Sequence, residues 1–174
     1  MQDLSMDTVT PSYEDEIILR KVRDSDREGI ITIFNHYATT SFAAYPEIPV
    51  NERFFDFLQE GNLGFYVLEH KNRVAGFGFI KPVLPFPAFM KTGMVTYFLL
   101  PECTGKGLGK ILLEKLTSDA SDRGMTSLVA NMASRNIPSI RFHQENGFKE
   151  VGRLQTAGRK FNEPFDVIWM QKMI

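Results

Sequence analysis

The 174-residue chain contains one cysteine, Cys103, which excludes an internal disulfide framework and a cysteine-rich metal site. No apolar run is long enough to cross a bilayer, and residues 1–16 are acidic and polar, unlike a signal peptide. With 20 Lys and Arg against 21 Asp and Glu, the net charge of −1 gives no general attraction for nucleic acid or anionic membranes. We therefore expect a cytoplasmic protein with neither a nucleic-acid nor a membrane partner.

Metal-ligand patterns are also missing. His36, His70 and His143 do not have any recognisable metal-ligand spacing, so no metal is predicted. Cys103 precedes a glycine-rich stretch, and one interpretation makes it a catalytic thiol. Because no histidine lies near it in the sequence, we interpret it as a packing or spacer residue.

The hydrophobic pattern predicts a mixed α/β protein after a mobile leader over residues 1–16. We expect a strand at 17–23, a helix capped by Asp24 or Ser25, and a helix capped by Asn51 that ends near residue 61. Strands at 64–70 and 73–80 flank a predicted turn at 71–72. A helix from residue 108, a strand at 127–132, a short helix from residue 136 and two closing strands follow. The residues expected on the sheet-facing side of the helix from 108 are Ile111, Leu112, Leu116 and Ala120.

The most informative stretch is 94–110, where an apolar strand stops at Pro101 and leads through glycines into a helix. The start of a helix presents free backbone N–H groups at the positive end of its dipole, which favours an anionic ligand. The glycines at 105, 107 and 109 let the backbone approach a phosphate closely, and the lysines at 106 and 110 add positive charge. The stretch predicts a phosphate cradle, although a turn whose glycines only relieve strain is the alternative.

Two common phosphate motifs do not fit this stretch. The dinucleotide pattern G-x-G-x-x-G fails because the third glycine comes one residue early. The P-loop pattern fails because Lys110 is followed by Ile111, which has no hydroxyl for magnesium. The cradle is therefore of a third kind.

A second block, 136–152, has a short helical segment that ends at Asn146-Gly147 before an apolar strand. Together the two blocks resemble the GCN5-related N-acetyltransferase (GNAT) superfamily. Its first block reads Arg or Gln, x, x, Gly, x, Gly or Ala, and Thr104 departs from it at the first position. The positions that match the two blocks are Gly107, Gly109, Asn136, Ser139, His143, Gly147 and Phe148.

The C-terminal stretch 157–171 resembles the phosphinothricin and amino-acid acetyltransferase branch, which writes Gly-x-Lys-x-Gly-x-x-Trp, an Asp, then Gln. The matching positions are Gly158, Lys160, Asp166 and Gln171, whereas Asn162 replaces the second glycine and no Trp stands at the motif's last position. With further likeness at 18–22 and 33–38, the resemblance covers nearly the whole chain from about residue 17.

This resemblance implies a GNAT fold over 17–174, a single acyl-CoA N-acyltransferase domain with a mostly antiparallel twisted sheet of about seven strands and about four helices. It implies acetyl transfer from acetyl-CoA to the primary amine of an amino acid or small amine, by direct attack through a tetrahedral intermediate. It also implies a homodimer. Aromatic residues of the acceptor loops, which core packing explains equally well, suggest a partly apolar acceptor: Phe34, Tyr37, Phe42, Tyr45, Phe86 and Phe89.

The resemblance also assigns the coenzyme site. In the family the strand before the cradle pairs with the pantetheine amides, its backbone N–H near Leu99 meets the thioester oxygen, and Asn136 bonds the coenzyme arm. Strand packing is the alternative role for Tyr97 and Phe98, and a helix cap is a compatible role for Asn136. The implied coenzyme-binding residues are Tyr97, Phe98, Leu99, Gly105, Lys106, Gly107, Leu108, Gly109, Lys110 and Asn136.

The catalytic residues follow in the same way. His143 falls where family members place the Tyr or His that protonates the leaving thiolate, and packing is its alternative role. The branch has a Glu base seven residues before the strand-ending proline, and Met94 stands there. A thioether cannot accept that proton. Thr96 on the same strand face could hold a water that relays the proton, and loop carboxylates such as Glu47 are other candidates.

Two further classes of protein fit the same motifs. Met94 and Thr104 are compatible with a non-catalytic acyl-CoA-binding domain that has a sensing or regulatory role. A nucleotide-binding domain using the glycine cradle is the third hypothesis. Turnover separates the first two, and competition between coenzyme A and nucleotides tests the third.

Overall fold

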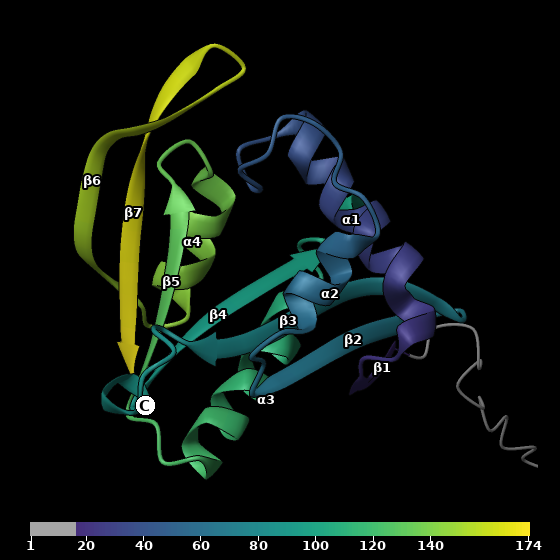
Figure 1. The fold of residues 1–174 in the computed structure, drawn as a ribbon, viewed down its shortest axis with the longest axis horizontal. Coiled ribbons are helices and arrows are strands. Elements are labelled where there is room, and N and C mark those ends of the chain that lie inside the picture. Colours follow the sequence, from purple (N-terminus) through teal and green to yellow (C-terminus); the bar gives the residue numbers. More distant parts are fainter. Residues whose placement is uncertain (1–16) are drawn as a thin grey trace, which may run out of the picture.

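The computed structural model describes residues 17–174, so the predicted leader at 1–16 lies outside the described residues. They form a seven-stranded sheet in the order β1-β2-β3-β4-β5-β7-β6 (Figure 1). All neighbouring strands are antiparallel except β4 and β5. The strands are β1 (Ile17–Lys21), β2 (Gly64–His70), β3 (Arg73–Pro82), β4 (Thr92–Leu99), β5 (Ser127–Ala133), β6 (Lys149–Lys160) and β7 (Glu163–Met173).

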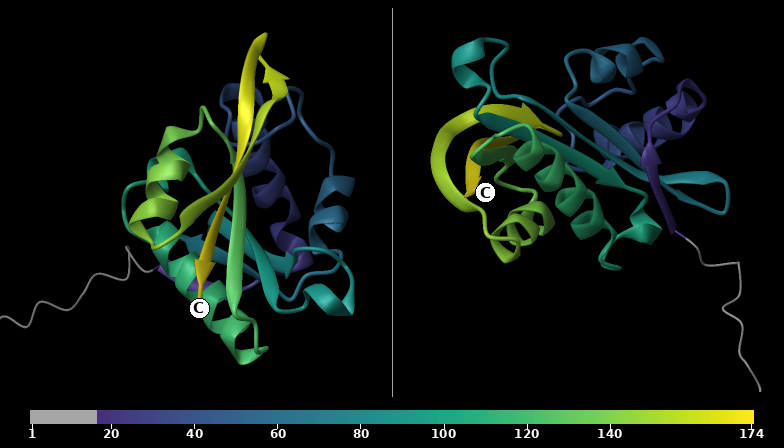
Figure 2. Two further views of the ribbon diagram at one scale, coloured as in Figure 1. Left: turned by 90° about the vertical axis from the view of Figure 1, so that its left-hand side faces the viewer. Right: turned by 90° about the horizontal axis from the view of Figure 1, so that it is seen from below.

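Four α-helices cover the two faces of the sheet: α1 (Arg27–Thr40), α2 (Arg53–Gln59), α3 (Leu108–Asp122) and α4 (Ile137–Glu145). The two views of Figure 2 show α1 and α2 on one side of the sheet and α3 and α4 on the other. Two separate hydrophobic cores result, one between the sheet and α3, the other between the sheet and α1 with α2. This arrangement confirms the predicted mixed α/β fold.

The two parallel strands at the centre of the sheet separate soon after they start. β4 and β5 pair only over Thr92–Met94 and Ser127–Val129, and no pairing follows beyond Met94. The later part of β4 continues beside β3, whereas β5 continues beside β7. In Figure 1 the two strands diverge upward from this point. We call the space between them the β4–β5 gap.

The local turn prediction is confirmed. Lys71 and Asn72 join β2 to β3 with φ values of 50° and 59°, the left-handed backbone that a two-residue hairpin turn requires. Asn136 also caps α4 as predicted, because its side-chain oxygen accepts a hydrogen bond from the Ser139 N–H at 3.4 Å.

Two sequence predictions about helices are wrong. The predicted caps Asp24 and Ser25 instead belong to a 3-10 turn, and α1 begins at Arg27 after Asp26, whose carboxylate accepts the Arg23 N–H at 2.7 Å. On α3, Ile111 is 38% exposed rather than sheet-facing. The buried stripe runs through 108, 112, 113, 116 and 120, so position 113 takes the place that position 111 was expected to fill.

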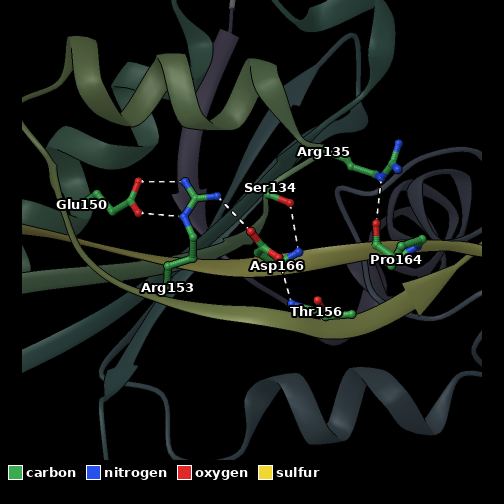
Figure 3. Close-up of polar contacts among 7 residues, drawn as sticks. All are labelled: Ser134, Arg135, Glu150, Arg153, Thr156, Pro164 and Asp166. Atoms are coloured by element: carbon green, nitrogen blue, oxygen red, sulfur yellow. Dashed lines mark hydrogen bonds and ion pairs between the residues drawn. The ribbon is translucent and has the colours of Figure 1, made fainter.

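Strand β6 of the β6–β7 hairpin contains a β-bulge. The pairing register shifts between Leu154 and Gly158, and Thr156 has a φ of 49°. Asp166 on β7 stabilises this bulge, since its carboxylate accepts the Thr156 N–H at 2.8 Å and pairs with Arg153 at 3.1 Å (Figure 3). Its pKa is lowered first by the Thr156 N–H and then by Arg153. Asp166, matched above to a family motif, therefore holds the hairpin in shape.

Candidate active site

The glycine-rich turn before α3 has the geometry of an anion cradle. Gly105 and Gly107 have φ values of 71° and 79°, and Gly107 is the N-cap residue of α3. A Cβ added to either glycine meets no atom within 4 Å, so open space lies in front of this backbone. Left-handed backbone and free N–H groups at a helix start are what a pyrophosphate needs. The cradle fits the coenzyme predicted for it.

Gly109 has a different reason to be glycine. It lies inside α3, and an added Cβ would be 3.3 Å from the ring of Phe142 on α4. Its smallness therefore lets α3 and α4 pack closely, whereas the sequence analysis explained it by close approach to phosphate.

A cavity of about 760 Å³ extends from the cradle into the β4–β5 gap. Residues on α3 and α4 line one part of it, and Tyr37 and Ala43, from α1 and the segment after it, line another. Since α1 and α3 cover opposite faces of the sheet, the cavity reaches both faces through the gap. The predicted coenzyme residues that line it are Tyr97, Phe98, Leu99, Gly105, Gly107, Gly109, Lys110 and Asn136.

Two predicted coenzyme residues are not part of this lining. Lys106 is exposed in the cradle turn. Leu108 is 8% exposed, and its side chain packs in the hydrophobic core under α3. Only the backbone of Leu108 is available to a ligand at the cradle.

The edge of β4 presents backbone donors to the gap. The Leu100 N–H donates to the Ala75 carbonyl across β3 at 2.8 Å. Because successive residues of a strand direct their backbone groups to opposite sides, the N–H groups of Tyr97 and Leu99 face away from β3, toward the gap. The Leu99 carbonyl accepts a hydrogen bond from the Tyr37 hydroxyl at 2.7 Å. Pairing of this edge with the pantetheine amides stays a prediction.

His143 is buried behind Tyr97 rather than among the residues that line the cavity. Its Nδ1 lies 2.7 Å from the Ser139 carbonyl, which can only accept, so Nδ1 carries the proton. Nε2 is then the acceptor for the Tyr97 hydroxyl. Burial lowers the pKa of His143, and burial raises the pKa of Tyr97 far above its ordinary value. Proton donation by His143 to a thiolate stays a prediction, and the structure adds a Tyr97 hydroxyl that connects the histidine to the cavity.

This burial predicts a pH-dependent stability. The folded protein keeps His143 neutral below 6.5, the ordinary pKa, where the unfolded chain already takes up a proton. The free energy of unfolding therefore decreases as pH falls from about 7.5 to 5.5, by up to about 1 kcal/mol for this residue. His143→Gln retains a donor and an acceptor and should lose less stability over that interval. Urea denaturation of both proteins at the two pH values measures the difference, and equal losses would contradict the assignment.

On the α1 side of the gap, Tyr45, one of the aromatic residues named above for the acceptor loops, meets Asn131, which no sequence pattern indicated. The Tyr45 hydroxyl donates to Asn131 Oδ1 at 2.8 Å, and Asn131 Nδ2 lies 3.6 Å from the Met94 sulfur. Tyr45 also stacks on Phe165, with ring centroids 5.9 Å apart. Tyr45 and Asn131 are 86 positions apart. No local motif joins them, and only the strand register could have indicated Asn131.

The other predicted participants are distributed around this point. Thr96 is half-buried, on the same face of β4 as Met94. Glu47 Oε1 accepts the Phe161 N–H at 2.6 Å, so that carboxylate is already bound to the β6–β7 turn. Phe34 is 7% exposed and belongs to the core under α1, which removes it from the acceptor loops.

Cys103 is 6% exposed, and burial raises the pKa of its thiol, which confirms its packing role. Among residues 17–174, no three or more His, Cys, Asp and Glu side chains are grouped to hold a metal ion. No helix in the described part of the chain is long and apolar enough to span a membrane.

Comparisons with known proteins agree with this architecture. Residues 30–148 match the acetyltransferase (GNAT) family. Phosphinothricin N-acetyltransferase from Alcaligenes faecalis is 29% identical over 160 residues, which cover 88% of this chain and 81% of that protein. L-amino acid N-acyltransferase MnaT from Escherichia coli (strain K12) is 29% identical over 157 residues, 88% of this chain and 91% of that protein. The structure of a phosphinothricin acetyltransferase from Sinorhizobium meliloti in complex with AcCoA superposes with a TM-score of 0.81 at 25% identity, covering 91% and 88% of the two chains.

The chain belongs to the acetyltransferase (GNAT) family, since the family match covers more than half of it. It is an acetyl-CoA-dependent N-acetyltransferase with the seven-stranded fold described above. These findings confirm the predicted family, fold, enzyme class and acetyl donor.

Proposed function

We propose that the enzyme moves an acetyl group from acetyl-CoA to the primary amine of an amino acid or small amine, by direct attack through a tetrahedral intermediate. The observation that supports this most strongly is the cavity that passes through the β4–β5 gap, with the glycine cradle at one face and the α1 segment at the other. The two substrates can therefore reach one point from opposite faces of the sheet. The names of the relatives, which include amino-acid acyltransferases, support the acceptor class.

Each part of the site has a role in this proposal. The cradle from Gly105 to Lys110 holds the pyrophosphate through backbone N–H groups, and Asn136 bonds the coenzyme arm. The edge of β4 pairs with the pantetheine amides. The Leu99 N–H donates to the oxyanion, with the Tyr97 N–H two residues nearer the closed end of the gap. The amine nitrogen bonds to the carbonyl carbon, and the C–S bond breaks as the carbonyl reforms.

Proton movements complete the reaction. The departing thiolate takes its proton from the Tyr97 hydroxyl, or from His143 after Nε2 has taken up a proton from solvent to form the imidazolium. The amine proton passes to a water held by Thr96, because Met94 cannot accept it. Without a carboxylate base the enzyme depends on the fraction of acceptor that is already uncharged. We therefore propose a rate that increases as pH rises toward the pKa of the acceptor amine.

The test is the initial rate of coenzyme A thiol release from acetyl-CoA with a panel of amino acids, phosphinothricin, methionine sulfone and simple amines. Release above the hydrolysis background with one acceptor class supports the proposal. Binding of coenzyme A without release for any acceptor contradicts it and favours the alternative, a GNAT-like domain that senses acyl-CoA. The predicted homodimer is a separate proposal, which sedimentation measures directly.

A further inference from the structure

Asn131 lies on β5 just beyond the point where this strand stops pairing with β4. It follows the last β4–β5 pair, Met94 with Val129, by two residues, so it stands where the two strands begin to separate. Its side chain contacts Met94 on β4 and Tyr45 from the segment after α1. It therefore lies at the closed end of the gap on the α1 side of the sheet, next to the cavity and outside its lining.

The contacts define how the amide is oriented. A thioether sulfur accepts hydrogen bonds and cannot donate, so the side-chain nitrogen of Asn131 faces Met94 and Oδ1 faces the Tyr45 hydroxyl. Burial raises the pKa of Tyr45 to about 12, so this hydroxyl is protonated and donates near neutral pH. In the structure, Asn131 Oδ1 therefore accepts one hydrogen bond, from the Tyr45 hydroxyl.

The side chains that contact this acceptor are uncharged, and Tyr45 itself is 45% exposed to solvent. Met94 and the stacked rings of Tyr45 and Phe165 lie around it. The carboxylates of the same region are already bound: Glu47 to the Phe161 N–H at 2.6 Å, and Asp166 to Thr156 and Arg153. An ammonium ion placed here would lack a charged partner, whereas a neutral amine needs only an acceptor for one N–H.

We propose that Asn131 is an acceptor-binding residue of this enzyme, whose Oδ1 exchanges the Tyr45 hydroxyl for an N–H of an uncharged primary amine carrying an apolar or aromatic group. This inference rests on the proposed function. Donation of one N–H to Oδ1 leaves the nitrogen lone pair free to form the new bond to the acetyl carbon.

Three variants test the assignment with the best acceptor from the amine panel. Asn131→Ala should lower kcat/KM for the amine about tenfold, which is the effect of losing one hydrogen bond, and leave the dissociation constant of coenzyme A unchanged. Asn131→Asp retains an acceptor oxygen at the same place and should exceed Asn131→Ala in kcat/KM. Tyr45→Phe removes the competing hydroxyl and should leave kcat/KM at the wild-type value or raise it.

A structural hydrogen bond would give another pattern. If the bond only ties Tyr45 to β5, Asn131→Ala and Tyr45→Phe should reduce kcat/KM and the melting temperature together, which would overturn the assignment. Unchanged kinetics of Asn131→Ala would overturn it as well, with the proposed function intact. Absence of turnover by the wild-type enzyme for every amine would overturn both, and this measurement is made first so that the two failures are distinguished.

Discussion

Gly107→Val is expected to weaken coenzyme A binding by about 10- to 100-fold, the effect of losing a hydrogen bond to a charged group worth about 1.5–3 kcal/mol. Gly107 has a φ of 79° and open space in front of it. Valine is a poor fit to this backbone, and its methyl groups would occupy the space in which phosphate oxygens approach the N–H groups at the start of α3. Calorimetric titration with coenzyme A measures the effect without any acceptor.

Gly61→Val is the matched control for this variant. Gly61 has a φ of 69°, no atom within 4 Å of an added Cβ, and a place in the exposed turn after α2. The Gly61→Val variant therefore has the same kind of backbone strain as Gly107→Val, at a site that does not line the cavity. Its dissociation constant for coenzyme A should equal that of the wild type. Equal weakening by both variants would show that strain alone is responsible and would contradict the cradle.

The features that could be predicted from the sequence are those with local causes. The turn at Lys71 and Asn72 and the Asn136 cap each depend on residues within four positions of one another. The cradle is also local, because its glycines and the start of α3 adjoin in the chain. The family motifs are local blocks of the same kind, and most of the residues they name for the coenzyme line the cavity.

The acceptor side depends on contacts between distant segments. Tyr45 meets Asn131 only because β5 leaves β4 at Met94, and this register is a property of the whole sheet. The burial of His143 behind Tyr97 has the same origin, since 46 positions separate the two residues. Residue types alone do not determine which of these contacts form. The alternation of side chains along β4 predicts the sheet face on which Met94 lies, but it does not predict which residues contact Met94.

Asp166 shows how a motif can match for a structural reason. In the sequence Asp166 matches the branch pattern, and the pattern assigns it no role. In the structure it holds a bulge at Thr156, whose φ of 49° is strained for a residue other than glycine (Figure 3). In this chain the hairpin that Asp166 holds carries Phe161, whose N–H binds Glu47, and Phe165, which stacks on Tyr45.

Lys160→Met is expected to lower the free energy of unfolding by about 3 kcal/mol, since buried carbonyls left without a donor cost about 1–3 kcal/mol each. Lys160 is 1% exposed at the end of β6. Its ammonium donates to the carbonyls of Ser41 and Ala44, each at 2.5 Å, and lies 3.4 Å from the Tyr37 carbonyl. Burial lowers its pKa. Methionine has a similar length and no donor, so the Ser41 and Ala44 carbonyls lose this partner, whereas the Tyr37 carbonyl keeps the Ser41 N–H at 3.2 Å.

Lys149→Met at the exposed start of the same strand is the control, and it should change stability by less than about 0.5 kcal/mol. Urea denaturation compares the two variants, and equal small losses would contradict the anchoring role. Because Lys160 fixes the segment that carries Tyr45, its replacement should also raise KM for the amine while coenzyme A binding stays unchanged. Gly107→Val, by contrast, should weaken coenzyme A binding and lose no more stability than the equally strained Gly61→Val, which would show that the two faces of the gap are built by separate parts of the chain.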